Sequence, residues 1–212
     1  MNRRNYQREL DGILEKLERE GRVPRLLLHS CCAPCSSYVL EYLSGYFEIT
    51  VLYYNPNIYP PCEYELRVNE EESLISRMSF VHPVKLVKGA YDPEVFYETV
   101  RGLEKEPEGG RRCFKCYELR LLEAARQASA GGYDFFTTTL SISPLKSAEK
   151  LNEIGERLGR EWHAAYLPSD FKKRDGYKRS IELSREYGLY RQDYCGCAYS
   201  VREETYNNVK NL

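Results

Sequence analysis

The chain has 212 residues, 42% of them hydrophobic, so it can build an ordinary core without disulfides. Its 31 lysines and arginines balance its 32 aspartates and glutamates, and the net charge of −1 argues against a general nucleic-acid binder, although local basic patches are allowed. There is no signal-peptide apolar stretch and no run near the roughly 20 apolar residues of a membrane helix, so we expect a soluble, cytoplasmic protein with no membrane partner.

Apolar residues recur with helical and extended periods that alternate along the chain. In chain order they predict a helix over 3–20, a strand over 25–30, a helix over 36–43, a strand over 48–54, a helix over 63–77, a strand over 83–87, helices over 93–102 and 113–130, a strand over 134–139, a helix from 144 or 145 to 158, a strand over 162–167, and helices over 177–187 and 198–209. This alternation predicts one α/β domain over residues 1–212, with a mainly parallel, doubly wound (Rossmann-like, HUP-like) sheet covered by helices on both faces. The first and last helices are additions to that core.

A doubly wound sheet binds its ligands beyond the carboxyl ends of its strands. The segment HSCCAPC follows the first strand, Asn55 and Asn57 follow the second, and Thr138 and Ser141 end the strand DFFTTT or follow it. All of these segments therefore converge on one edge of the sheet. We take the two asparagines, Thr138 and Ser141 as candidate substrate-binding residues.

Seven of the eight cysteines fall into three clusters, which are Cys31, Cys32 and Cys35; Cys113 and Cys116; and Cys195 and Cys197. In a reducing compartment, thiols this closely spaced indicate a metal site rather than disulfides. Neighbouring side chains in extended backbone point to opposite sides, so Cys31 and Cys32 can share one metal ion only where the chain turns.

Seven thiols exceed the four ligands of one tetrahedral zinc. They could hold a cubane iron–sulfur cluster with four ligands and a neighbouring, open-sited metal with three; two closed zinc sites would need one further ligand. We interpret His29 as a satisfied core histidine and the isolated Cys62 as an incidental free thiol. Gly196, between Cys195 and Cys197, lets the backbone bend so that both sulfurs aim inward.

Five segments, in order, resemble the cobalamin-independent epoxyqueuosine reductases, the QueH family: HSCCAPC, YYNPNIYPPCEYELR, RCFKC, FFTTTLSISP and GLYRQDYCGCAYS. The resemblance runs from about Leu26 to Ser200. It implies the last step of queuosine biosynthesis, the reductive deoxygenation of epoxyqueuosine at the wobble position of tRNA. It also implies a 4Fe–4S cluster beside a second metal, which we expect to be iron. Some members have Asp at the position of Cys35, and either residue can ligate iron.

Removal of the epoxide oxygen requires two electrons and a proton donor. We expect an open-sited metal to act as a Lewis acid on the epoxide oxygen while the cluster delivers electrons from an unidentified, ferredoxin-like or flavodoxin-like donor. The candidate proton donors are Tyr54, Tyr59, Tyr190 and Tyr194, all in segments that border the predicted site.

The partner implied by the resemblance is a tRNA that carries epoxyqueuosine in its anticodon. We expect Lys172, Lys173 and Arg174 to meet its phosphates, and Arg111 to do so near the site. Two rival interpretations are a zinc-stabilised RNA- or nucleotide-binding module and an iron–sulfur enzyme of tRNA sulfur transfer. The number of clustered thiols opposes the first rival, and the absence of an SGGxDS nucleotide loop opposes the second.

Overall fold

The computed structural model describes residues 4–200 of the chain. Its elements are α1 (Tyr6–Glu20), β1 (Arg25–Ser30), α2 (Ala33–Leu43), β2 (Glu48–Tyr53), α3 (Pro61–Arg77), β3 (Val84–Lys88), α4 (Pro93–Thr99), α5 (Arg111–Ala130), β4 (Phe135–Thr138), the 3-10 helix η1 (Thr139–Ile142), α6 (Ala148–Glu161), β5 (Ala165–Tyr166), α7 (Gly176–Glu186) and the 3-10 helix η2 (Ala198–Ser200). Across this described part of the chain, no helix is both long and apolar enough to cross a membrane.

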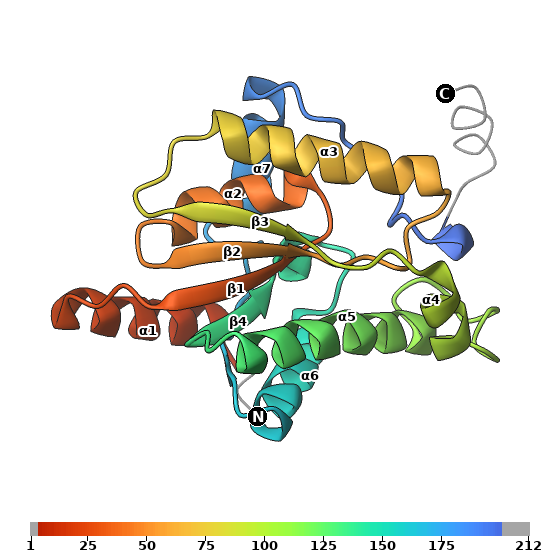
Figure 1. Ribbon diagram of the computed structural model, residues 1–212, viewed down its shortest axis with the longest axis horizontal. Helices are drawn as coiled ribbons and strands as arrows, with labels where there is room; N and C mark the ends of the chain where they lie inside the picture. The colour runs from red at the N-terminus through yellow and green to blue at the C-terminus, as the bar shows by residue number, and fades with distance from the viewer. Residues whose placement is uncertain (1–3, 201–212) are drawn as a thin grey trace.

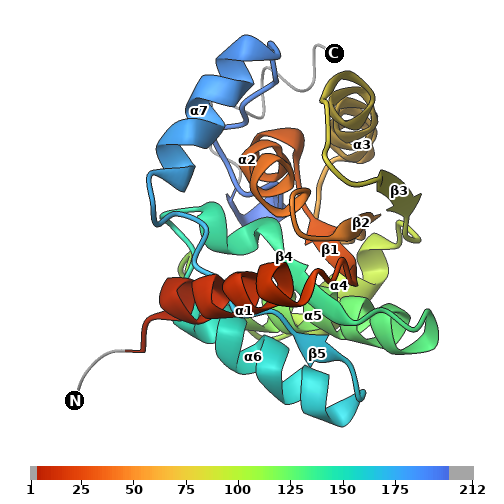
Figure 2. The ribbon, with the colours of Figure 1, turned by 90° about the vertical axis from the view of Figure 1, so that its left-hand side faces the viewer.

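Within residues 4–200, five strands form one all-parallel sheet in the order β3-β2-β1-β4-β5. Helices α1, α2, α3 and α7 lie on one side of the sheet, and α5 and α6 lie on the other with α4 beside α5 (Figure 1 and Figure 2). The predicted α/β class with a doubly wound parallel sheet is thus confirmed. Because the strand order changes direction at β1, a ligand crevice is expected beyond the carboxyl ends of β1 and β4.

Strand β1 lies at the centre of the core and is buried on both faces. Leu26 and Leu28 pack with Leu10 and Leu14 of α1 and with the apolar side of α2. Leu27, on the opposite face, packs with the apolar residues of α5 and α6. This alternation follows from the two-residue period of a strand, and it explains why the β1 sequence is continuously apolar.

The largest differences from the predicted boundaries surround α6 and β5. Helix α6 begins at Ala148 rather than at 144 or 145, because the Ser147 hydroxyl accepts a hydrogen bond from the Lys150 amide and caps the helix there. The predicted strand over 162–167 is reduced to Ala165–Tyr166. Its first residues form the turn out of α6, where His163 has a φ of 54°.

The predicted last helix over 198–209 is described only at its start, as η2 (Ala198–Ser200). The remainder of that prediction lies outside the described residues, and the single domain over 1–212 stays a prediction. In Figure 1 the strands point to the right, where η2 and the first turns of α3 and α5 gather beyond their carboxyl ends.

Candidate metal centre

Cys31, Cys32 and Cys35 form a compact group at the carboxyl end of β1. Their sulfur atoms all lie within 4.8 Å of one another, and the Cys31 and Cys32 sulfurs are 3.8 Å apart. The chain bends at Cys31 and enters α2 directly after Cys32, and this change of direction lets the neighbouring side chains share one side. Three thiols at this separation can bind one metal ion and leave a coordination position open.

The other four clustered thiols surround a second space. Cys113 and Cys116 from α5, together with Cys195 and Cys197, line a narrow cavity of about 10 Å³. The structure therefore divides the seven thiols into a three-thiol group and a four-thiol cavity. These four thiols match the ligand number of a cubane iron–sulfur cluster, but in the described part of the chain it is the group Cys31, Cys32 and Cys35 whose ligand atoms already lie within 4.8 Å of one another.

The three-thiol group and the four-thiol cavity are neighbours, because one cysteine lines the spaces at both. Cys195 lines the four-thiol cavity and also the pocket of about 290 Å³ that contains Cys31, Cys32 and Cys35, which we call the three-thiol pocket. A redox group held in the four-thiol cavity would therefore lie close to a metal ion held in the three-thiol pocket.

The thiols differ in their readiness to lose a proton. Hydrogen bonds from Cys32 and Cys35 lower the pKa of Cys31 well below its ordinary value. Burial raises the pKa of Cys116 to about 12. A bound metal ion reverses that second shift because it holds its ligands as thiolates.

Arg120 is a buried cation in the lining of the four-thiol cavity, and its lack of a charged partner indicates whether this site suits an anionic group. It is 1% exposed, and it donates hydrogen bonds only to the uncharged Cys116 carbonyl and Asn55 side chain, at 3.2 and 3.4 Å. Its Nη2 has no partner among the described residues. Burial opposes its charge, but Cys116 and Cys195 raise its pKa.

Lys146 is a second cation beside the thiols. It is half-buried and lines the three-thiol pocket. Burial opposes its charge, but Cys195, Cys31 and Cys35 raise the pKa of its ammonium group. Buried charges are rare unless they are paired, and the buried Arg120 has no carboxylate partner within residues 4–200. Metal-bound thiolates would supply the missing negative charge, so the donor set fits the predicted metals.

Arg67 of α3 fixes the segment that carries Cys195 and Cys197. Its Nε bonds to Glu63 at 2.6 Å, and both side chains are 1% exposed. Its Nη1 donates to the Cys195 carbonyl at 3.3 Å. Gly196 has a φ of +107°, and a side-chain carbon there would lie 2.9 Å from Arg67 Nη1. The glycine is therefore required both by its backbone conformation and by the close approach of the guanidinium.

The four predicted proton-donor tyrosines occupy different positions. Tyr194 lines the three-thiol pocket, and its hydroxyl donates to the Tyr59 carbonyl at 3.2 Å. The Tyr190 hydroxyl is 3.4 Å from Glu63. Tyr54, Tyr59 and Tyr190 are not among the residues that line the three-thiol pocket or the four-thiol cavity. Their role as proton donors stays a prediction.

The predicted substrate-binding residues near the strand ends are buried. Asn55 donates to the Ser30 carbonyl at 2.7 Å, Thr138 bonds to His29, and Ser141 bonds to Ser169. Asn57 is 2% exposed, and neither polar atom of its side chain has a partner among the described residues. The structure brings these side chains to the carboxyl edge of the sheet, but places them beneath the surface.

Of the predicted basic residues, Lys172, Lys173 and Arg174 lie together in one loop, and Arg111 lies elsewhere. Arg111 is an exposed residue at the start of α5, 3.9 Å from Glu106. Lys172 bonds to Asp170 at 2.5 Å and Arg174 bonds to Asp11 at 2.6 Å, whereas Lys173 is exposed without a partner in the described part of the chain. Their contact with RNA stays a prediction.

The interpretation of His29 as a satisfied core histidine is confirmed. It is fully buried, with Nδ1 2.8 Å from the Thr138 hydroxyl and Nε2 3.1 Å from the Tyr54 carbonyl. Because a carbonyl can only accept, the proton lies on Nε2. Burial lowers the pKa of His29 to about 4, so the ring stays neutral. Cys62 is exposed at the start of α3 and lies outside both thiol groups.

Sequence reasoning missed Arg67, Arg120, Lys146 and Tyr177, the last of which is 38% exposed and lines the three-thiol pocket. None of them belongs to a short motif with a chemical meaning of its own. Two signals were available for Arg67, namely its place at the end of the segment YYNPNIYPPCEYELR and its spacing of four residues from Glu63 in a predicted helix.

The sequence model of the family described as epoxyqueuosine reductase QueH matches residues 26–203. Among similar curated proteins, the epoxyqueuosine reductase QueH of Staphylococcus epidermidis is 42% identical, with 94% of this chain and 86% of that protein covered. That of Streptococcus pyogenes is also 42% identical, with 93% and 78% covered. That of Thermotoga maritima is 32% identical, with 84% and 91% covered.

Proposed function

This chain belongs to the epoxyqueuosine reductase QueH family, and from that premise we infer that it is an oxidoreductase that converts epoxyqueuosine to queuosine in tRNA. The structural observation that supports this function best is the division of the thiols. Four of them surround one cavity, three form an adjacent group, and Cys195 borders both. A purely structural zinc module has no need of two neighbouring thiol sites.

We propose that Cys113, Cys116, Cys195 and Cys197 hold a 4Fe–4S cluster. The three-thiol group then holds a second metal, which we propose to be iron. Two features support this assignment. The first is the ligand number of each site, and the second is the buried cation Arg120, which lacks a carboxylate partner in the described residues, with the half-buried Lys146 beside the three-thiol group.

The reaction consumes two electrons and two protons, and it yields an alkene and water from the epoxide. When bound, the two metal groups supply the electrons and a Lewis acid next to them. The chain itself must hold the modified base against the three-thiol pocket and deliver protons there. Lys146 and Tyr194 both line this pocket, and Lys146 places a positive charge where negative charge develops on the departing oxygen.

The wobble base must leave the anticodon stack to enter the three-thiol pocket, as bases do in enzymes that modify them. Tyr177 offers an exposed aromatic ring in the lining of this pocket, suited to stack on such a base. The electrons come from a ferredoxin-like or flavodoxin-like donor, and the enzyme acts in the cytoplasm together with its tRNA substrate.

Anaerobic preparations of the wild type and single cysteine variants test the proposal. Cys197→Ala should lose turnover of epoxyqueuosine-containing tRNA together with most inorganic sulfide, whereas Cys35→Ala should lose turnover but keep sulfide and the cluster absorption. Cys62→Ala is the matched control, because this thiol belongs to neither site. Full activity and full metal content in Cys197→Ala, or a protein that binds only zinc after reconstitution with iron and sulfide, would contradict the proposal.

A further inference from the structure

A large groove of about 930 Å³ opens next to the three-thiol pocket, and the cysteines take no part in it. We call it the α1 groove, because the start of α1 forms one wall. The segments 144–149 and 170–174 form the others. Its lining includes six basic side chains (Arg4, Arg8, Lys146, Lys172, Lys173 and Arg174) and three acidic ones (Asp11, Glu149 and Asp170).

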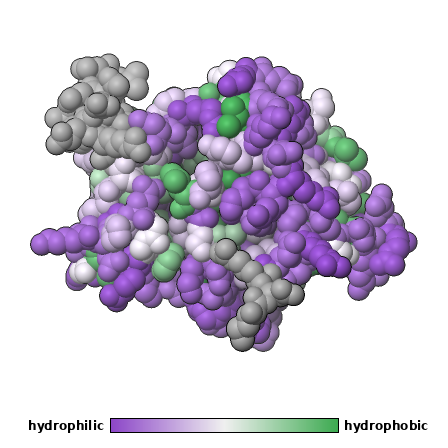
Figure 3. Space-filling model, turned by 180° about the vertical axis from the view of Figure 1, so that it is seen from behind, coloured by the Kyte–Doolittle hydropathy of each residue, from purple (hydrophilic) through white to green (hydrophobic). Residues whose placement is uncertain are grey.

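With Glu9 and Glu156, which pair with Arg4, five carboxylates face these six cations, so the excess of positive charge is small. It arises because Arg8 and Lys173 add positive charge to a groove whose other cations are largely balanced. The face seen from behind is mostly hydrophilic, with scattered hydrophobic areas (Figure 3). A polar, cationic groove in an otherwise balanced protein is the electrostatic footprint of an anionic partner.

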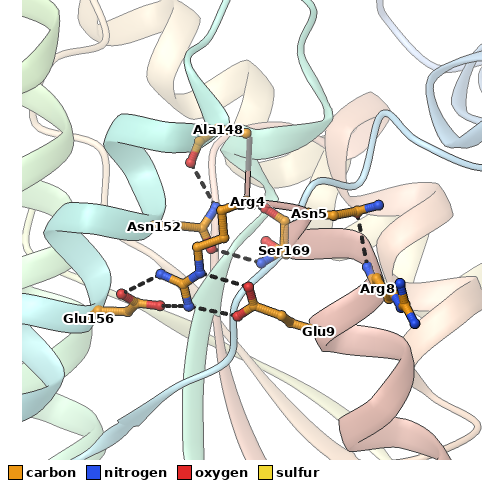
Figure 4. Close-up of polar contacts among 8 residues, drawn as sticks. All are labelled: Arg4, Asn5, Arg8, Glu9, Ala148, Asn152, Glu156 and Ser169. Atoms are coloured by element: carbon orange, nitrogen blue, oxygen red, sulfur yellow. Dashed lines mark hydrogen bonds and ion pairs between the residues drawn. The ribbon is translucent and has the colours of Figure 1, made fainter. Parts of the chain in front are cut away.

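Ion pairs and hydrogen bonds between the walls of the α1 groove hold these walls in place. Arg4 bonds to Glu9 of α1 and to Glu156 of α6, each at 2.6 Å, and so ties the start of α1 to α6 (Figure 4). The Asn152 amide donates to the Ala148 and Ser169 carbonyls at 2.7 and 2.9 Å, which holds the other two walls at a set separation. The groove is therefore formed before any partner arrives.

Two cations on opposite walls remain available to a ligand. Arg8 is exposed and stays out of the Arg4 clamp (Figure 4), and Lys173 is exposed on the facing loop. Neither side chain has a hydrogen bond or ion pair within residues 4–200. Lys172 and Arg174, by contrast, are already paired with Asp170 and Asp11. Arg8 and Lys173 are the pair that an incoming anion would meet first.

The α1 groove shares part of its lining with the three-thiol pocket. Pro144, Leu145 and Lys146 line both spaces, so a molecule that lies in the groove can insert one group over this shared edge toward the thiols. Leu145 is 69% exposed and gives the edge an apolar surface. An electron-donor protein needs only to approach the cluster, whereas this layout suits a polyanion whose one base enters the pocket.

We propose that the α1 groove binds the sugar-phosphate backbone of the tRNA anticodon arm, with Arg8 and Lys173 contacting phosphates on either side. The inference rests on the proposed function for the identity of the RNA. Its physical basis is separate, namely a preformed cationic groove that is joined to the reactive pocket. Phosphate contacts of this type position the RNA and make its affinity salt-dependent.

The test compares the holoenzyme with an Arg8→Glu/Lys173→Glu variant in binding to a synthetic anticodon stem–loop RNA across a salt series. The matched control is Lys85→Glu/Lys88→Glu, which makes the same change of charge on β3, at the other edge of the sheet from β5. We expect the groove variant to bind about 10- to 100-fold more weakly at low salt, with a salt slope reduced by about 1 to 2. The control should bind RNA as the wild type does, and both variants should keep the wild-type metal content. The control loses the exposed Lys88–Glu72 pair, so its melting temperature should fall by no more than a few degrees.

The outcomes separate this inference from the proposed function. Weaker RNA binding with the expected slope supports the groove even if the holoenzyme fails to reduce epoxyqueuosine. If the groove variant binds RNA with wild-type affinity, the inference that the α1 groove binds the RNA backbone is wrong, even where turnover confirms the reductase activity. A variant that binds RNA normally but accepts electrons more slowly from a donor protein would identify a donor-docking surface and also overturn the inference.

Discussion

Arg67→Met should destabilise the protein strongly and loosen the YCGC segment. The substitution removes the 2.6 Å bond to Glu63 and the 3.3 Å bond to the Cys195 carbonyl, and it leaves the Glu63 carboxylate buried without its partner. Removal of one member of a buried ion pair costs about 3–5 kcal/mol. At roughly 2–4 °C per kcal/mol for a chain of this size, the melting temperature should fall by about 6–20 °C.

The double variant Glu63→Leu/Arg67→Met separates the two consequences of the loss. It contains no unpaired buried charge, so it should regain most of the lost stability. It still lacks the donor to the Cys195 carbonyl, so its sulfide and iron content should stay low. Lys88→Met breaks the exposed pair with Glu72 and serves as the control, with an expected loss below about 1 kcal/mol.

Thermal unfolding, with iron and sulfide measured on the same samples, checks these expectations. A melting temperature of Arg67→Met equal to that of Lys88→Met would show that the buried pair does not stabilise the fold. Full metal content in both Arg67 variants would show that the guanidinium does not position Cys195.

Two further predictions concern single side chains near the site. Burial raises the pKa of Glu71 from its ordinary value of 4.5 to about 8, so unfolding releases a proton in this range and stability falls as the pH rises from 4.5 towards 8. Glu71→Gln removes this dependence, worth about 1.4 kcal/mol per pH unit, and urea midpoints that run parallel to the wild type from about pH 5 to 8 would contradict the assignment. Tyr177→Ala should raise the KM for tRNA about 10-fold while Tyr177→Phe keeps it, because stacking needs the ring and not the hydroxyl; equal KM values for both variants would exclude stacking.

Much of the fold could be predicted because local patterns and the core agree. The apolar run over 25–30 predicted a strand, and the alternation of strands and helices predicted a parallel sheet covered on both faces, as the structure shows. The boundaries of α6 and β5 were wrong because a single cap at Ser147 and the turn at His163 decided them. Those features depend on hydroxyl and backbone geometry that periodicity does not report.

The sequence by itself determined the α/β class of the fold, because strands and helices alternate along the chain. The spacing of seven thiols also predicted a metal site at the carboxyl ends of the strands. Only the tertiary structure decided how those thiols divide, since Cys195 and Cys116 are far apart in sequence and meet around one cavity. It also decided which cations belong to the site. Arg120, Lys146 and Arg67 are ordinary basic residues in the sequence, and their roles follow from burial beside thiols or a carboxylate, which folding alone brings about.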